Sequence, residues 1–321
     1  MRLSTVILPV FPWAEGRSVW RRADELGFHA GYTYDHLSWR SFRDRTWFGA
    51  VPTLAGAAAV TRTLRLGPLV TSPNFRHPVT LAKDLMSLDD LSAGRLVVGI
   101  GSGGTGFDAT VLGSAPWTPG ERADRFDEFV PLLDGLLRHP ITTEAGAYYS
   151  AVEARMIPGC VQRPRVPFVV AATGPRGYRL AAELGEGWVT FGDPGRSAGA
   201  SASADRRAVR SQLEGLEAAC AARGRSFDSI EKVLLQSPGG GRPLDSLDAF
   251  VDWAGHYAAL GITELVVHWP IAGSVFDADP GTFERIATEG LGQLGVSSGA
   301  RARDIRRDGD GDGHGASEPP I

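Results

Sequence analysis

The chain has 321 residues, a net charge of −4 and 43% hydrophobic residues, values that suit a globular protein with a substantial core. The slight excess of acidic residues argues against nucleic acid as a partner, and no apolar run is long enough to cross a bilayer. The N-terminal apolar stretch is broken by Pro9 and Pro12 without a cleavage site, so it predicts a strand rather than a signal peptide. Two cysteines, Cys160 and Cys220, make no disulfide framework, which favours a reducing cytoplasm.

Strand-like and helix-like segments alternate along most of the chain. Eight short apolar segments have the length and β-branched content of buried strands: 3–9, 29–34, 64–70, 95–100, 168–172, 187–191, 231–236 and 263–269. Each is followed by a segment with helical spacing of its apolar residues: 15–26, 47–61, 78–91, 121–137, 175–184, 205–223, 245–260 and 280–294. This regular series predicts an α/β fold of the (β/α)8 TIM-barrel type rather than a doubly wound sheet.

The remaining segments define the domain limits. We expect one barrel domain over residues 1–297, with residues 141–166 as an irregular insertion outside the barrel. Residues 298–321 are polar and glycine-rich, which predicts a disordered tail. Asp308, Asp310 and Asp312 imitate the start of a calcium loop, but the twelfth position is Pro319, so we expect no calcium site and no other metal.

A glycine-rich loop follows the segment 95–100, with five glycines between Gly99 and Gly106. Glycine lets a backbone approach a ligand closely, and α/β folds bind ligands at the C-terminal ends of their strands. Gly99, Gly101 and Gly104 also match the G-x-G-x-x-G motif of dinucleotide-binding proteins. That motif normally lies in a first βαβ unit and runs directly into a helix, whereas three β/α units precede this loop. An NAD(P)-dependent Rossmann-type dehydrogenase and a plain glycine-rich connection are therefore the alternatives to a barrel ligand site.

Polar residues follow several of the predicted strands and therefore collect at one rim of a barrel. His36 is the best acid–base candidate, because imidazole titrates near neutral pH and the neighbouring Asp35 could orient it. A structural histidine is the alternative, and His268 would be the next candidate base. The turn 173–177 lies between a strand and a helix, where backbone N–H groups, a hydroxyl and Arg176 suit a phosphate.

These residues resemble the bacterial luciferase-like oxidoreductase superfamily of flavin- or F420-dependent enzymes. The resemblance covers about residues 1–295 and rests on the sequence segments 35–37 (DHL), 76–78 (RHP), 91–95 (LSAGR), 99–106 (GIGSGGTG) and 172–174 (ATG). It implies a (β/α)8 barrel with an insertion and a flavin-type ring at the mouth of the barrel.

The resemblance also assigns roles to individual residues. His36 is similar to the family's catalytic histidine, with Asp35 beside it, and Thr71 and Ser72 match the strand end beneath the ring. The family often has a cis non-proline peptide there; here Pro73 follows Ser72, so a cis bond could be an ordinary one before proline. The remaining implied cofactor contacts are Gly101, Ser102, Gly103 and Gly104 for the ring and ribityl chain, and Thr173, Gly174 and Gly177 for the phosphate. Some F420-dependent members carry an acidic residue directly after these glycines, whereas Asp108 is displaced along the chain, which leaves its role open.

The resemblance implies hydride transfer or monooxygenation of a small organic substrate, with coenzyme F420 slightly favoured over FMN. A non-catalytic flavin-binding barrel is the alternative from another functional class. The expected partners are a small-molecule substrate, a flavin or F420 reductase and a second copy of the chain, and neither nucleic acid nor a membrane. We expect the substrate pocket to be formed by Trp13, Trp39 and Phe75 together with the segments 106–119 and 195–204.

Overall fold

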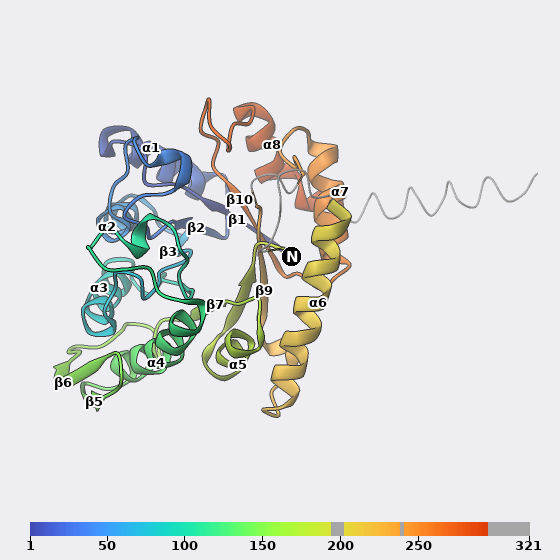
Figure 1. Cartoon of the computed structure of the whole chain (residues 1–321). Coiled ribbons are helices and arrows are strands. Elements are labelled where there is room, and N and C mark those ends of the chain that lie inside the picture. Colours follow the sequence, from blue (N-terminus) through green and yellow to red (C-terminus); the bar gives the residue numbers. More distant parts are fainter. Residues whose placement is uncertain (194–201, 238–240, 295–321) are drawn as a thin grey trace, which may run out of the picture.

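The computed structural model describes residues 1–193, 202–237 and 241–294, and these form a single parallel sheet surrounded by helices (Figure 1). The strands of the sheet are β1 (Arg2–Val6), β2 (Ala30–Thr33), β3 (Arg65–Pro68), β4 (Val98–Ile100), β7 (Phe168–Ala171), β8 (Gly187–Thr190), β9 (Glu231–Leu235) and β10 (Glu264–His268). Their order is β3-β2-β1-β10-β9-β8-β7-β4, and all neighbouring pairs are parallel.

The two outer strands of this order, β3 and β4, meet and bring the sheet round into a barrel. Isolated bridges join Leu66 to Leu96 and Thr71 to Ile100. The two strands approach so closely that a Cβ atom on Gly67 would lie 1.6 Å from the carbonyl oxygen of Val97, which explains the need for glycine there. The predicted (β/α)8 barrel is confirmed, and the Rossmann alternative is wrong.

Each strand of the barrel leads to a helix, as the sequence pattern predicted. The helices are α1 (Trp13–Glu25), α2 (Ala50–Val60), α3 (Pro78–Leu91), α4 (Pro119–Arg138), α5 (Pro175–Leu184), α6 (Ala202–Ala221), α7 (Leu247–Ala258) and α8 (Pro280–Glu289). Residues 202–204, which we expected at the end of a loop, instead begin α6, and residues 194–201 lie outside the described residues. The predicted tail, including Asp308, Asp310 and Asp312, also lies outside them.

The insertion is more regular than the sequence predicted. It contains an antiparallel hairpin of β5 (Ile141–Ala145) and β6 (Ser150–Arg155), which is separate from the barrel sheet (Figure 1). The hairpin is attached to α4 through Glu128. The carboxylate of Glu128 accepts hydrogen bonds from the backbone N–H groups of Tyr148, at 3.0 Å, and Tyr149, at 2.5 Å. Its location outside the barrel is confirmed, but the expectation of irregular structure is wrong.

Two apolar clusters fill the molecule. The larger lies between the strands and the surrounding helices and includes Trp20, Phe129 and Phe250. The smaller contains at least one buried side chain from most of the strands, such as Val169 and Val266, as expected for side chains that point into a barrel. This inner cluster extends to aromatic residues that follow β2, and these contribute to the candidate site.

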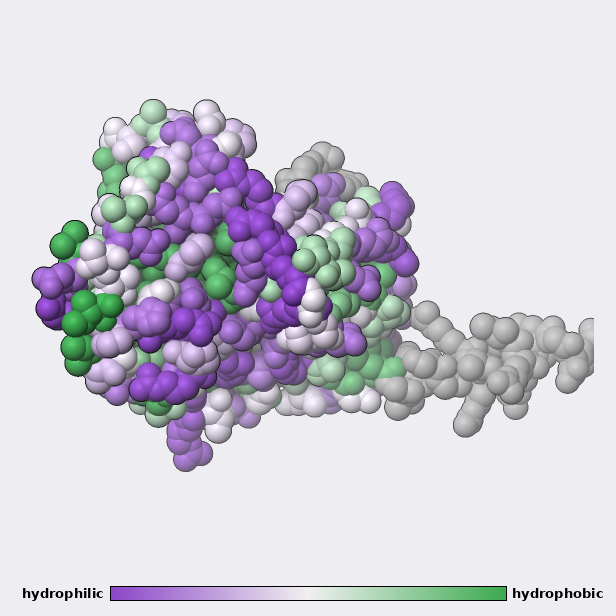
Figure 2. All heavy atoms as spheres, turned by 90° about the horizontal axis from the view of Figure 1, so that it is seen from below, coloured by the Kyte–Doolittle hydropathy of each residue, from purple (hydrophilic) through white to green (hydrophobic). Residues whose placement is uncertain are grey.

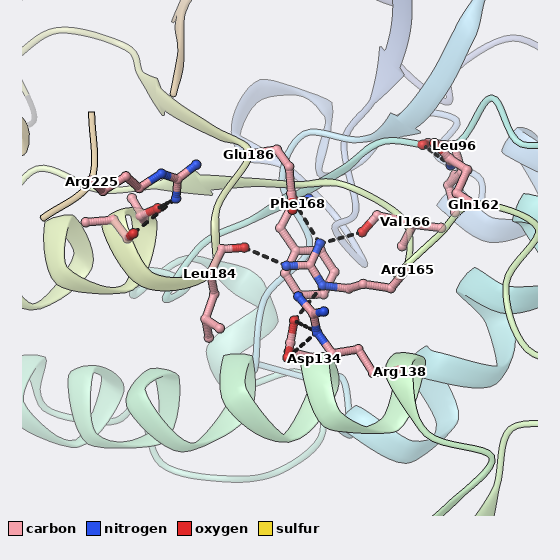
Figure 3. A network of polar contacts seen from close by, with 12 residues as sticks. Leu96, Asp134, Arg138, Gln162, Arg165, Val166, Phe168, Leu184, Glu186 and Arg225 are labelled. Carbon is pink, nitrogen blue, oxygen red and sulfur yellow. Dashed lines mark hydrogen bonds and ion pairs between the residues drawn. The ribbon is translucent and has the colours of Figure 1, made fainter. Parts of the chain in front are cut away.

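A buried arginine joins the insertion to the barrel (Figure 3). The Arg165 side chain is 1% exposed and lies between the carboxylates of Asp134, at 2.6 Å, and Glu186, at 2.9 Å. It also donates to the carbonyl oxygen of Leu184 at 2.6 Å, and its guanidinium lies 3.6 Å from the ring centroid of Phe168. One side chain therefore links α4, the end of α5 and the start of β7.

The molecular surface is largely hydrophilic on the face shown in Figure 2, with the most strongly hydrophobic residues gathered at one edge and in the centre. Among the described residues, no helix is long and apolar enough to span a membrane. The same part of the chain contains no group of three or more potential metal ligands.

Candidate functional site

A cavity of about 270 Å³ opens at the C-terminal ends of the barrel strands. It is lined from β2, β3, β7, β8 and β9 and the residues that follow them: Tyr34, His36, Trp39, Arg40, Leu69, Val70, Ala171, Val189, Phe191, Asp193, Leu235, Gln236 and Ser237. Its position is the one at which barrel enzymes bind their ligands. Trp39 lies where the sequence predicted.

His36 is held at this cavity by a distant carboxylate. Its Nδ1 atom makes a short hydrogen bond with Oδ2 of Asp108, and the other carboxylate oxygen of Asp108 accepts the backbone N–H of Leu37 at 2.7 Å. The indole of Trp47 donates to the carbonyl oxygen of His36 at 2.7 Å, which fixes the backbone as well. Within the described residues Nε2 of His36 has no hydrogen-bond partner, so this nitrogen is available to a ligand in the cavity.

Asp35 does not have the place that we expected beside His36. Its carboxylate is 3% exposed and accepts hydrogen bonds from the guanidinium of Arg76, at 2.6 and 3.0 Å, and from the hydroxyl of Thr71 at 2.7 Å. Consecutive residues of an extended chain point in opposite directions, which explains why the two neighbours have different partners. Asp108 therefore occupies the position next to His36 that we assigned to Asp35.

Thr71 and Ser72 are buried where β3 meets β4, and both lie beside the cavity rather than among its lining residues. The cis non-proline peptide bond joins Leu69 and Val70, both of which line the cavity. The cis bond after β3 is therefore of the non-proline kind that the resemblance suggested, and the bond before Pro73 is not cis.

The glycine loop after β4 packs closely against two neighbouring strands. A Cβ atom on Gly101 would lie 2.8 Å from a methyl group of Val70 and 3.5 Å from Cβ of Ala171. Gly103 has a φ of +74° and lies against Asn74, whose amide donates to the carbonyl oxygen of Gly104 at 3.1 Å. The loop, with Ser102 within it, continues to the short helix η2 (Phe107–Ala109) that carries Asp108, instead of entering a long helix as a dinucleotide motif would.

The turn before α5 has the free donors that an anion requires. Gly174 is the N-cap of α5 and no side chain caps this helix, whose second residue in the first turn is Arg176. Within the described residues the backbone N–H groups of Arg176 and Gly177 have no partner. Gly177 is also required for packing, since a Cβ atom there would lie 2.6 Å from Cβ of Ala172. Thr173 is exposed at the same turn.

The guanidinium of Arg176 does not serve this turn as we expected. It pairs with Asp124 at 2.7 Å and Asp127 at 2.6 Å, both on α4. Any anion at the turn would therefore be held by backbone N–H groups and the hydroxyl of Thr173.

An aromatic wall closes one side of the cavity. The hydroxyl of Tyr34 lies 2.8 Å from Nε2 of His268, and the His268 ring stacks on Phe276 with centroids 4.0 Å apart. Burial lowers the pKa of His268 to about 3, so its imidazole is neutral at physiological pH. His268 is thus part of the wall that supports Tyr34 and Trp39, and burial excludes it as a ready proton acceptor.

Some of the site could not be read from the sequence. Trp13 lies against Gly56, where a Cβ atom would be 2.6 Å from its ring, and neither Trp13 nor Phe75 is among the described lining residues. Tyr34 and Gln236 do line the cavity, and only their positions at the ends of predicted strands pointed to them. The importance of Asp108 became visible only through its contact with His36.

Known proteins resemble this chain in sequence and in fold. The model of the family described as luciferase-like monooxygenase matches residues 1–238. An F420-dependent glucose-6-phosphate dehydrogenase of Beutenbergia cavernae is 36% identical over 54% of this chain and 51% of its own length. A 4-hydroxyprotoasukamycin monooxygenase of Streptomyces nodosus subsp. asukaensis is 30% identical over 76% of this chain and 66% of its own.

The chain spans about half the length of the F420-dependent glucose-6-phosphate dehydrogenases that it matches. Among solved structures, a coenzyme F420-dependent tetrahydromethanopterin reductase of Methanopyrus kandleri superposes with a TM-score of 0.69 at 17% identity, over 91% of this chain and 99% of that one. The likeness to this solved structure supports the barrel fold. The family model matches residues 1–238, which make up most of the chain. The chain therefore belongs to the luciferase-like monooxygenase family.

Proposed function

We propose that this protein is an oxidoreductase that moves a hydride between a small organic substrate and coenzyme F420 bound at the C-terminal end of the barrel. The observation that carries the proposal is His36, whose Nδ1 is fixed by Asp108 and whose Nε2 is available at the cavity. Several relatives with F420 dependence in their names support the choice of this cofactor over FMN.

The residues present fit a cofactor of the flavin or deazaflavin type. The cavity has apolar walls that suit a planar ring, formed by Leu69, Val70, Ala171 and Val189. The uncapped first turn of α5 offers N–H donors and the positive end of a helix to a phosphate, with the hydroxyl of Thr173 beside them. When bound, such a group supplies the acceptor or donor of the hydride.

The protein's own residues would manage the proton and the alignment of the substrate. In alcohol oxidation, Nε2 of His36 accepts the hydroxyl proton as the hydride leaves the carbon, and in carbonyl reduction the same nitrogen returns it. Asp108 holds the imidazole in one orientation, so it acts as a positioning residue. Asp35 binds Arg76 and Thr71 and thereby fixes the strand ends from which His36 extends.

The cofactor assignment is tested by titrating the purified protein with F420 and with FMN and following ligand absorbance and fluorescence. Thr173→Ala should weaken F420 binding by roughly 1 kcal/mol or more, because one hydrogen bond to the phosphate is lost. Thr288→Ala, an exposed threonine on α8, is the matched control and should bind as the wild type does. Preferential binding of FMN would contradict the choice of F420, and equal affinity of Thr173→Ala would contradict the phosphate site.

The catalytic assignment is tested with His36→Ala and Asp108→Asn. His36→Ala should lower turnover by about 10²- to 10⁴-fold with little change in F420 affinity, because the phosphate donors lie on another loop. Asp108→Asn should lower turnover less and alter the dependence of turnover on pH, while retaining the N–H contact to Leu37. Normal turnover of His36→Ala at saturating F420 would refute the role of His36. A protein that binds F420 but shows no turnover with any alcohol or carbonyl compound would support a non-catalytic binding barrel.

A further inference from the structure

A second cavity lies on the outside of the barrel, between α6 and α7. Its volume is about 560 Å³, against about 270 Å³ for the cavity at the strand ends, and the two share none of their described lining residues. Because α6 packs against α5 and α7 packs against α8, a groove is left between α6 and α7, on the side of the molecule away from the hairpin (Figure 1). A groove of this size can hold a small organic molecule.

One side of this groove carries three arginines of α6. Arg206, Arg207 and Arg210 all line it, and Arg210 lies one helical turn from each of the other two. Among the described residues none of the three has a hydrogen-bond or ion-pair partner, whereas Arg176 of α5 pairs with two carboxylates of α4. Like charges one turn apart destabilise a helix, and an anion between them would remove this cost.

The groove keeps its excess of positive charge despite one carboxylate. Asp252 of α7 also lines it, but this aspartate has an interaction of its own and makes no ion pair with the three arginines. The described lining residues therefore include three arginines without partners and a single acidic side chain that is already engaged. An anionic ligand is the chemistry that this arrangement favours.

The other side of the groove is apolar, and a glycine keeps it open. Val251, Leu260 and Leu294 supply the apolar surface. Gly255 lies in the interior of α7, where glycine is less favourable than alanine by about 1 kcal/mol. Packing does not require this glycine, because a Cβ atom there would meet its nearest neighbour, Leu294, at 3.9 Å. The space that the missing side chain leaves is thus available to a ligand.

A phosphate group matches the three arginines better than a carboxylate does. One guanidinium can bind both oxygens of a carboxylate through two parallel hydrogen bonds, whereas a phosphate presents three charged oxygens. Three guanidiniums on adjacent turns of one helix therefore suit a phosphate or two linked phosphates. The apolar side of the groove suits the organic part of such a ligand.

We propose that the groove between α6 and α7 binds an organic diphosphate. The phosphates lie on the arginines of α6, and the organic part lies on the apolar side formed by α7 and Leu294. This site is separate from the cofactor site at the barrel mouth, so the inference goes beyond the proposed function and does not depend on it.

The test measures the binding of ADP, inorganic pyrophosphate and adenosine by isothermal titration calorimetry on the full chain. ADP should bind more tightly than pyrophosphate, since the nucleoside adds apolar contact, and adenosine should bind at least about tenfold more weakly than ADP. Raising the salt concentration from about 50 to about 300 mM should weaken ADP binding, because the charges lie near the surface. Equal binding of adenosine and ADP, or no binding of ADP at about 1 mM, would overturn the proposal.

Substitutions in the groove locate the site. Arg206→Ala and Arg210→Ala should each weaken ADP binding by at least about tenfold, the scale of one lost charge-assisted hydrogen bond. Arg21→Ala is the matched control with unchanged affinity, because it removes an exposed arginine of α1 that has no partner among the described residues. Gly255→Leu fills the groove and should also weaken ADP binding by at least about tenfold. Urea denaturation should show no loss of stability in this variant, because leucine favours a helix more than glycine does.

The same measurements separate the groove from the cofactor site. ADP should bind equally well to the F420-free and the F420-loaded protein, and Thr173→Ala should leave its affinity unchanged, because Thr173 is no part of the groove. Displacement of ADP by F420, or loss of ADP binding in Thr173→Ala, would overturn the inference. If F420 does not bind, the proposed function fails, but ADP binding that Arg210→Ala weakens and Arg21→Ala preserves would still support the groove. Wild-type affinity of both Arg206→Ala and Arg210→Ala would overturn it.

Discussion

The buried histidine behind the cavity makes a quantitative prediction about stability in acid. Burial lowers the pKa of His268 to about 3, whereas a histidine in an unfolded chain titrates near 6.5. Because the folded-state pKa is the lower one, the stabilising contribution is complete above pH 6.5 and is lost as the pH falls towards 3. Each pH unit within that window favours the unfolded state by about 1.4 kcal/mol, which amounts to about 3 kcal/mol at pH 4.5.

His268→Gln removes the titration and keeps a polar group near the Tyr34 hydroxyl. The free energy of unfolding is measured by urea denaturation at pH 7.5 and 4.5 for the wild type and the variant, with tryptophan fluorescence as the probe. We expect the variant to be less stable at pH 7.5, since the stacking on Phe276 is disturbed, but to lose about 3 kcal/mol less than the wild type on acidification.

A second histidine provides a comparison. Burial, followed by the charges of Arg2 and Arg65, lowers the pKa of His29 to about 4, and its side chain is only half-buried. His29→Gln should therefore change the pH dependence in the same direction by a smaller amount. If the free energy of unfolding of the wild type and of His268→Gln changed equally with pH, the reasoning would be refuted. That result would mean that His268 takes up its proton equally in the folded and the unfolded state.

Two further predictions concern buried charges. Burial raises the pKa of Glu264, so its contribution to stability is present at low pH and lost as the pH rises through the folded-state pKa. In urea denaturation at pH 4.5 and 7.5, Glu264→Gln should therefore gain stability relative to the wild type at the higher pH, and a constant difference would contradict this. Arg165→Met should lower the free energy of unfolding by about 3 kcal/mol or more, because Asp134 would keep only its more exposed partner Arg138 and the carbonyl oxygens of Val166 and Leu184 would lose their donor (Figure 3). Arg138→Met removes a more exposed partner of the same carboxylate and should cost less than about 1 kcal/mol; equal losses in both variants would contradict the importance of burial.

The barrel could be predicted because its strands are buried on both faces. Segments such as Phe168–Ala171 and Glu264–His268 are short and apolar, and turn residues separate them from amphipathic helices. The hairpin in the insertion follows no such pattern, since all residues of Ile141–Ala145 are at least partly exposed and their sequence is mixed. Its strands are stabilised by pairing and by Glu128, a contact that no local sequence pattern reveals.

The site was predictable as a set of strand ends but not as a set of contacts. The sequence placed His36, the loop 99–106 and the turn 173–177 at one rim, because each follows a parallel strand. It could not place Trp13, since an aromatic side chain near the start of a helix packs equally well on a neighbouring helix. The roles assigned to Thr71, Ser72 and the glycines toward a cofactor remain predictions that the binding experiments address.

The two aspartates show how the pairing at the site depends on the path of the chain. Asp35 is adjacent to His36 in sequence, but the extended backbone directs its carboxylate to Arg76 and Thr71 on the side of β3. Asp108 is 72 residues from His36, and the glycine loop after β4 returns it to the imidazole. Asp108 does not follow the glycines directly in the sequence, but the loop and η2 bring its carboxylate to His36.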